Sequence, residues 1–199
     1  MINKQILVIG PNTGKASGLE TFINNLIYCR VNKYYNFTVI NDYFGSISFL
    51  NKFFYSFNSL FVLLRTLRTT RFSLVQVHCN SIKFSFYFKF LQVIICKLLS
   101  VKVITRFGSG SSYNYFDKGN VVEQIIFSNF FRMQDAIIVQ SKTAKCFYSK
   151  FINSEKIYTI PNFVPDSNIL SKVKGYANNK LNLMFVSGSD ESTSRLKGA

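Results

Sequence analysis

A loop of small residues directly follows the first apolar run of the chain, and it is the first place where chemistry could occur. Residues 10–18 read GPNTGKASG. The phosphate loop of ATPases and GTPases needs four residues between its glycines and a Ser or Thr after its lysine. Here three residues separate Gly10 from Gly14, and Ala16 follows the lysine. The pattern instead predicts a strand-to-helix turn, in which Gly14 and Gly18 allow close backbone approach and the first helix amides favour an anion.

His78 is the only histidine of the chain, and it is the natural candidate for proton chemistry because its ordinary pKa lies near neutrality. It ends the apolar run SLVQVH at residues 73–78. That run predicts a strand whose carboxyl end lies at the edge where open α/β sheets bind ligands. A buried histidine with satisfied hydrogen bonds explains the same position equally well.

The cysteines give no sign of a metal site. Cys29, Cys79, Cys96 and Cys146 lie far apart in apolar runs, without a C-x-x-C pair. With a single histidine, this spacing argues against structural zinc. It favours buried free thiols in a reducing compartment, so that we expect a cytoplasmic protein without a metal or other cofactor.

The formal net charge of +15 is unevenly distributed. No acidic residue lies between Asp42 and Asp117, whereas basic residues stand at Lys52, Arg65, Arg68, Arg71, Lys83, Lys89, Lys97, Lys102 and Arg106. Such a field attracts anionic substrates or an anionic membrane surface. A solvated basic face that meets no specific partner is the alternative. A nucleic-acid-binding protein is suggested by charge alone, because no recognition motif is present.

Two apolar regions, residues 53–64 and 82–99, need to be weighed as membrane spans. A span requires about 20 apolar residues. The first region is too short, and the second is interrupted by Lys83, Lys89 and Lys97. Both are therefore expected to be buried or surface-lying helices. The basic, aromatic stretch 49–106 favours peripheral contact with the inner face of a membrane.

Strand and helix patterns alternate along the first part of the chain. Short apolar runs predict strands at residues 5–10, 37–40, 73–78, 101–106, 136–140 and 156–160, with helical periods between them. This alternation predicts a doubly wound, Rossmann-like α/β domain with a parallel sheet, over residues 1–165. Residues 166–180 lack a clear period and predict a linker. A new apolar run follows, and residues 181–199 predict the start of a second α/β domain that breaks off at Ala199.

Five segments in this order resemble the family 4 glycosyltransferases, which have the GT-B fold. SGLETFINNLI (17–27) resembles their Gly-Gly-x-Glu helix start, and SLVQVHCN (73–80) resembles a strand that ends in Val-His. DAIIVQSK (135–142) and IYTIPNFVP (157–165) resemble the Ala-Asp-x-Ile-Ile strand and the Ile-Pro-Asn segment that closes the first domain. LMFVSGSDESTSRLKGA (183–199) resembles the opening of the second, donor-binding domain.

The resemblance implies a hexosyltransferase-like enzyme that moves a sugar from a nucleotide-sugar donor to a polysaccharide, glycan or lipid-linked acceptor, with retention of configuration and without a metal. The chain would supply the acceptor-side wall of a cleft between two domains. His78 and Arg106 would be catalytic. The residues implied in substrate or donor binding are Gly14, Ser17, Gly18, Gly108, Ser141, Asn162 and Lys197.

Several of these residues have a simpler explanation. Ser141 is expected to cap a helix, and Asn162 after Pro161 is expected to form a turn. Lys197 matches the family lysine that clamps the donor diphosphate, and a lysine that is simply exposed to solvent is the alternative.

The chain also departs from the family pattern. Ser17 stands where the family has a second glycine, and Phe107 stands where it often has a histidine. Gly188-Ser189 replaces the usual Gly-Arg, and Arg195 is the nearest arginine that could substitute. The paired glutamates of the family would lie beyond Ala199, so that this chain alone is expected to be inactive. The alternatives are an inactive fragment or split-gene product and a basic nucleic-acid-binding α/β protein.

Overall fold

The computed structural model describes residues 4–11, 18–42, 48–79, 83–108 and 119–161. Within these ranges the chain forms one sheet of six parallel strands. The strands are β1 (Lys4–Gly10), β2 (Tyr35–Asn41), β3 (Leu74–Cys79), β4 (Val103–Phe107), β5 (Ala136–Val139) and β6 (Ile157–Thr159). The helices are α1 (Gly18–Tyr28), α2 (Phe49–Thr69), α3 (Lys83–Leu98), α5 (Val121–Arg132) and α6 (Lys142–Tyr148), with 3₁₀ turns η1 (Arg30–Lys33) and η2 (Ser154–Lys156).

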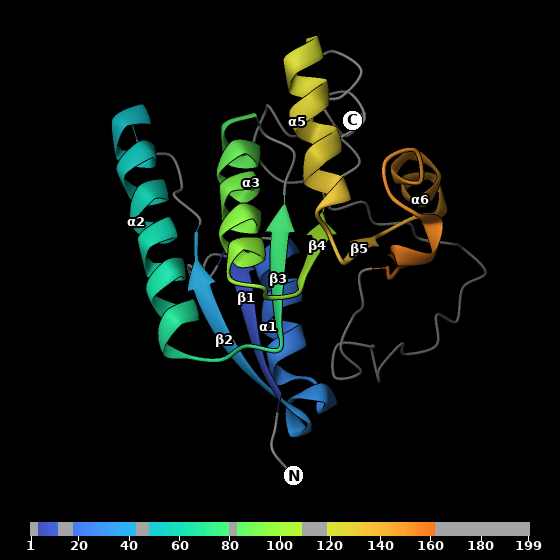
Figure 1. Ribbon diagram of the computed structural model, residues 1–199. Helices are drawn as coiled ribbons and strands as arrows, with labels where there is room; N and C mark the ends of the chain where they lie inside the picture. Colours follow the sequence, from blue (N-terminus) through green and yellow to red (C-terminus); the bar gives the residue numbers. More distant parts are fainter. Residues whose placement is uncertain (1–3, 12–17, 43–47, 80–82, 109–118, 162–199) are drawn as a thin grey trace, which may run out of the picture. The chain divides into compact units, whose positions relative to one another are not determined.

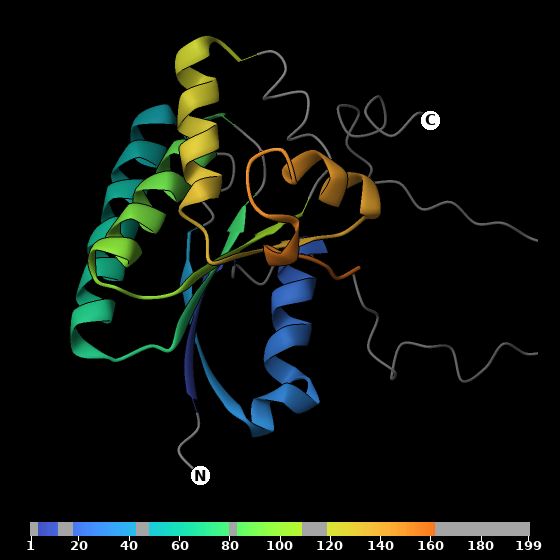
Figure 2. The same cartoon turned by 45° about the vertical axis from the view of Figure 1, so that its right-hand side comes forward.

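The predicted doubly wound α/β fold is confirmed. Figures 1 and 2 show α2, α3 and α5 on one face of the sheet and α1 on the other. The predicted strands and helices all appear, with ends shifted by a few residues. The predicted linker at 166–180 and second domain at 181–199 lie outside the described residues, and these two assignments stay predictions.

The core lies on the face that is covered by α2, α3 and α5. Alternate residues of β3, including Val75, Val77 and Cys79, are fully buried there. Phenylalanines of α5 pack in the same core. Phe130 and Phe131 are fully buried, and their rings contact the ring of Phe107 from β4. Burial of such rings is the largest single contribution to a core of this size.

Polar residues fix where the helices begin at the carboxyl edge of the sheet. Asn120 accepts a hydrogen bond from the Glu123 amide at 2.9 Å, and the Glu123 carboxylate accepts one from the Asn120 amide at 3.0 Å. This capping box satisfies amides that the first turn of α5 leaves without helical partners. Ser48 caps α2 in a similar way, through a weaker bond from the Asn51 amide at 3.4 Å.

One expectation about the thiols is wrong. Cys79 and Cys96 are buried as expected, but Cys146 is exposed and Cys29 is half-buried. Cys146 lies on α6, where the buried positions are Ala144 and Tyr148. In a seven-residue helix that packs through one side, an apolar residue on the other side faces water.

Candidate active site

The strand order β2-β1-β3-β4-β5-β6 creates a topological switch point between β1 and β3. In open α/β sheets, ligands bind outside the carboxyl ends of the strands at such a point. Gly10 ends β1 there, beside His78 of β3. A Cβ atom built on Gly10 would stand 3.1 Å from the His78 Cβ atom and 2.6 Å from the Ile23 Cδ1 atom of α1. Glycine is therefore needed because β1, β3 and α1 approach one another closely.

His78 is buried at this point and is hydrogen-bonded within its own strand. Its Nε2 atom lies 2.8 Å from Nε2 of Gln76, two residues earlier on the same face of β3. Because an amide nitrogen only donates, this contact assigns the accepting lone pair to His78 Nε2 and the proton of the neutral ring to Nδ1. Nδ1 is buried and has no hydrogen-bond partner among the described residues.

The ring of His78 is neutral at physiological pH. Burial, followed by the positive charges of Lys89 and Arg106, lowers the pKa of His78 to about 3. A general base works best when its pKa lies near the operating pH, so that this state is a poor match for proton abstraction at neutrality. It is well suited to donate a hydrogen bond from Nδ1. The catalytic role of His78 stays a prediction.

Arg106 lies next to His78 on the neighbouring strand β4, in direct register. Its side chain is 1% exposed. The guanidinium carbon stands 3.6 Å from the centroid of the Phe22 ring, and Nη1 donates to the Ile160 carbonyl at 3.3 Å. Burial lowers the pKa of Arg106 to about 10, which leaves it charged at neutral pH. Arg106 thus provides a fixed cation that joins β4 to α1 and to the end of β6.

Sequence reasoning did not find Phe22 of α1, which contacts this pair, or the buried carboxylate of Glu20 in the same helix. Phe22 contacts both members, since its ring also lies 5.7 Å from the His78 ring. Glu20, in the first turn of α1, is only 3% exposed. The sequence did contain a signal for Glu20, because its carboxylate stands among apolar residues in the helix start SGLETF. A carboxylate is rarely buried unless it has a partner.

Of the other predicted site residues, three lie in the described part of the chain and four lie outside it. Gly108 lies at the same edge, where its amide donates to the Cys79 carbonyl at 3.3 Å and its carbonyl accepts from Gln140 at 3.1 Å. Gly18 is the first residue of α1. Ser141 caps α6 by accepting from the Ala144 amide at 3.1 Å, as the simpler explanation predicts. Outside the described residues lie Gly14, Ser17, Asn162 and Lys197.

Phe107 stands where the resembling family often has a histidine, and its position in the sheet explains the difference in polarity. Successive residues of a strand point to opposite faces. Arg106 therefore points to the α1 side, while Phe107 points into the core and packs on Phe131 and Tyr148 with ring centroids 5.3 and 4.8 Å away. A polar ring at position 107 would be buried among phenylalanines.

A cavity of about 360 Å³ lies away from this pair, between the edge strand β2 and α2. Its lining residues are Val39, Ile40, Asn41, Tyr55, Asn58, Ser59 and Val62. None of the residues predicted as a site lines it, so the cavity does not bear on the roles predicted for them.

Among the described residues, no group of three His, Cys, Asp or Glu side chains could hold a metal ion. No described helix has both the length and the apolar content that crossing a membrane requires. The chain matches no protein-family model and no curated protein.

Proposed function

We propose that the chain is the acceptor-side domain of a glycosyltransferase that uses a nucleotide-sugar donor. The observation that carries this proposal is the buried pair His78 and Arg106, side by side at the carboxyl ends of β3 and β4. It lies next to the switch point at which α/β sheets of this kind bind ligands. The five segments that resemble family 4 glycosyltransferases add the reaction class.

The charge of Arg106 suits an anionic leaving group. In sugar transfer, the bond between the anomeric carbon and the diphosphate oxygen breaks, and the diphosphate leaves with the electron pair. A new bond forms to the acceptor oxygen, whose proton the departing diphosphate can take. A cation that is held in place before the reaction stabilises the developing negative charge without reorganisation. Arg106 is held in this way by Phe22 and the Ile160 carbonyl.

His78 would act as a hydrogen-bond donor. Its pKa of about 3 keeps the ring neutral, and the contact with Gln76 leaves the Nδ1 proton for another partner. A neutral donor orients a hydroxyl or a phosphate oxygen of a substrate without adding charge.

Two of the basic residues that suggest nucleic acid as the alternative are not free to bind it. Lys89 forms an ion pair with Asp42 in which both side chains are 6% exposed. Lys97 pairs with Asp135 at 2.5 Å. These two cations of the basic stretch are neutralised within the protein. Nucleic-acid binding would need such residues free on one face.

Nucleotide binding by the full-length protein tests the proposal, because the resemblance implies a donor-binding domain beside the acceptor-side domain. Nucleoside diphosphates and their sugar derivatives would be titrated calorimetrically. We expect one to bind, Arg106→Gln to weaken it about tenfold or more, and Arg106→Lys to recover part of the loss because the charge returns.

The matched control is Arg132→Gln, which removes an exposed arginine of α5 and should leave the affinity unchanged. Circular dichroism of each variant shows whether it is folded. The proposal is wrong if no nucleotide or nucleotide sugar binds, or if folded Arg106→Gln binds as Arg132→Gln does.

A further inference from the structure

In the first half of helix α2, polar residues are buried and aromatic residues are exposed. Two of its inward positions carry Ser56 and Ser59, which are 1% and 6% exposed. Its outward positions carry Phe54 and Phe61, which are 69% and 65% exposed. A helix that packs on a sheet normally turns its apolar residues inward. Among the described residues, every exposed phenylalanine belongs to this one helix: Phe53, Phe54, Phe57 and Phe61.

A buried polar cluster lies under the inward side of α2 and includes the Ser59 hydroxyl. Ser59 donates to the Ser56 carbonyl at 2.9 Å, and Gln92 of α3 lies 3.5 Å from the Ser59 hydroxyl. Gln92 also reaches Asp42, which pairs with Lys89. The Ser59 hydroxyl is thus bonded within α2 and against α3, whereas the buried Ser56 hydroxyl has no hydrogen-bond partner among the described residues. The orientation is fixed by this cluster, and the phenylalanines face outward as a consequence.

The outward residues form a continuous stripe that changes character along the helix. Leu50, Phe54, Phe57, Phe61, Arg65 and Arg68 are spaced by three or four residues, which places them on one face. The first four are apolar and the last two are cations. All six are exposed, and we call them the α2 stripe. From Phe54 to Arg68 it extends about 21 Å, at about 1.5 Å per residue.

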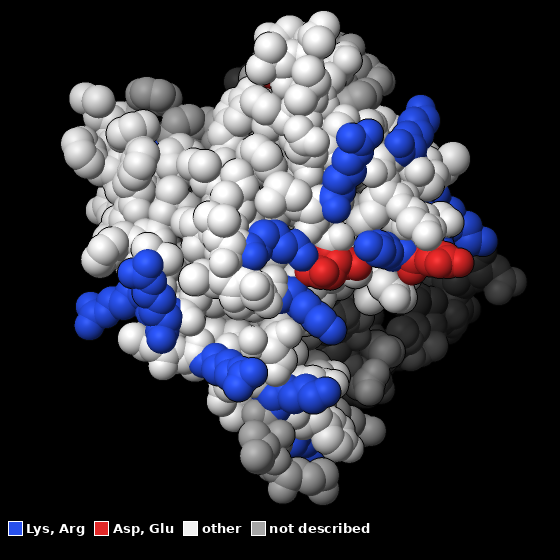
Figure 3. Space-filling model, viewed as in Figure 1, with Lys and Arg blue, Asp and Glu red and all other residues white. Residues whose placement is uncertain are grey.

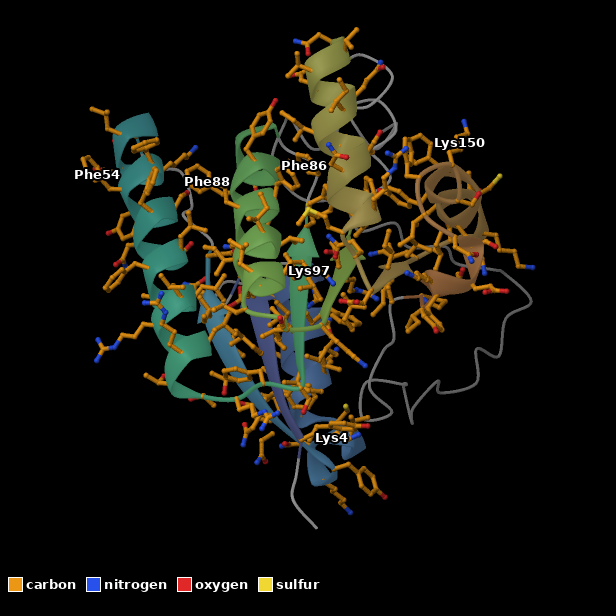
Figure 4. The ribbon with its side chains drawn as sticks, viewed as in Figure 1. Lys4, Phe54, Phe86, Phe88, Lys97 and Lys150 are labelled. Atoms are coloured by element: carbon orange, nitrogen blue, oxygen red, sulfur yellow. The ribbon has the colours of Figure 1, made fainter. Side chains whose placement is uncertain are left out.

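The figures show the same division. In Figure 3 the upper part of α2 is white, and blue side chains lie toward its lower end. Figure 4 shows Phe54 pointing away from the protein at the upper end of α2, while Phe88 of α3 lies on the inner side. Phe53 and Phe57 contact Phe88, with ring centroids 6.3 and 5.7 Å apart. Phe54 and Phe61 are therefore the most exposed rings of the α2 stripe.

We propose that the α2 stripe docks the protein on the surface of an anionic lipid membrane. A helix with aromatic residues and arginines on its outer face lies in the interface plane, with the rings among the acyl chains and the cations at the headgroups. The charge of the protein fits this partner: the net charge is +15, and neither Arg65 nor Arg68 forms a salt bridge with a described residue. Because α2 does not span, the contact is peripheral.

The apolar end of α2 follows β2 and begins at the carboxyl edge of the sheet, the edge that also carries His78 and Arg106 (Figure 1). Docking would bring that edge close to the lipid surface. The inference does not depend on the proposed enzymatic function, and its test measures lipid binding alone.

Vesicle co-sedimentation of the full chain tests the proposal. Vesicles of phosphatidylcholine alone are compared with vesicles that also contain phosphatidylglycerol. We expect binding to the anionic vesicles and at least about tenfold weaker binding to the neutral ones. The double variant Phe54→Ser/Phe61→Ser should lower the affinity for anionic vesicles by about tenfold or more. Arg65→Gln/Arg68→Gln should lower it by about fivefold or more and reduce its salt dependence.

Matched controls separate the α2 stripe from general stickiness and general charge. Tyr28→Ser/Tyr34→Ser removes two aromatic rings that are 84% and 67% exposed on α1 and just after η1. Lys142→Gln/Lys150→Gln removes two exposed cations of α6 and the turn that follows it. Both control variants should bind anionic vesicles within about twofold of the unmodified chain.

Three results would overturn the proposal. The first is no binding to anionic vesicles, or equal binding to both kinds. The second is unchanged binding by a folded Phe54→Ser/Phe61→Ser variant. The third is a dimer of the unmodified chain in light scattering that this variant dissociates, because the α2 stripe would then be covered by a second copy.

Discussion

The two faces of one strand, β3, are built from different chemistry. Val75, Val77 and Cys79 point into a core filled by phenylalanines, and each is fully buried. Gln76 and His78 point to the α1 side and are equally inaccessible, at 6% and 1% exposed. A parallel strand that is buried on both faces is usually an unbroken apolar run. Burial does not distinguish the two faces, but polarity does, and it marks the α1 side as the side with a role beyond packing.

The cost of that polarity shows why it requires an explanation. Burying a charged group without compensation is expensive. Arg106 extends the polar face onto β4, where it contacts Phe22 and donates to the Ile160 carbonyl. On the opposite face, the buried Thr105 hydroxyl donates to Gln134 at 2.9 Å. Experiments that treat the two faces separately can break or sharpen this comparison.

The largest effect is expected on the apolar face. Phe131→Ala removes a fully buried ring that contacts Phe107, Phe127 and Tyr148. The lost burial and the cavity together should lower the free energy of unfolding by about 3–5 kcal/mol. Urea denaturation followed by circular dichroism measures it. A loss below about 1 kcal/mol would mean that this face is not the core.

On the polar face, the expected effect depends on pH. The pKa of His78 is lowered to about 3 in the folded protein and is about 6.5 when unfolded. The unfolded state therefore binds more protons between these values, so that stability falls as the pH is lowered through this window. At pH 5 the free energy of unfolding should be about 2 kcal/mol lower than at neutral pH from this group alone.

Urea denaturation at the two pH values checks this, with His78→Gln as the reference. The variant keeps the contribution of all other groups and lacks the histidine, so that the difference between the two pH dependences isolates His78. Equal pH dependence in both proteins would show that the histidine is not held neutral by its surroundings.

A smaller effect distinguishes a structural from a functional Ser141. If its hydroxyl only caps α6, Ser141→Ala should lower the free energy of unfolding by about 1 kcal/mol, and Ser141→Asp, which keeps an accepting oxygen, should restore most of it. Nucleotide affinity should not change in either folded variant. A tenfold loss of nucleotide affinity in Ser141→Ala would show that Ser141 takes part in nucleotide binding.

The sequence was sufficient for the fold because short apolar runs and helical periods are local signals. It also placed His78 at the carboxyl end of a strand, since the run SLVQVH ends there. Its neutral state could not be predicted, because Lys89 and Arg106, which lower its pKa, come close only through the packing of α3 and the pairing of β3 with β4. The stacking of Arg106 on Phe22 likewise joins residues of two distant segments.

Orientation was a second limit. The helical period between the strands predicted at 37–40 and 73–78 indicated a helix, and α2 occupies Phe49–Thr69. The same period did not say which side faces inward, because both sides of this helix are rich in apolar residues. The buried contacts of Ser59 and Gln92 with the ion pair of Asp42 and Lys89 decide it, and they involve three separate elements.

The smallest expected effect on stability belongs to the outward rings of α2. Phe54 is 69% exposed, and its ring centroid lies 6.4 Å from that of Phe53 in the same helix. Phe54→Ser should therefore change the free energy of unfolding by less than about 0.5 kcal/mol, against several for Phe131→Ala, and urea denaturation compares the two directly. A loss as large as that of Phe131→Ala would show that Phe54 packs within the folded chain. A near-zero loss leaves a large ring in water without a benefit to folding, as expected of a residue that serves a contact outside the chain.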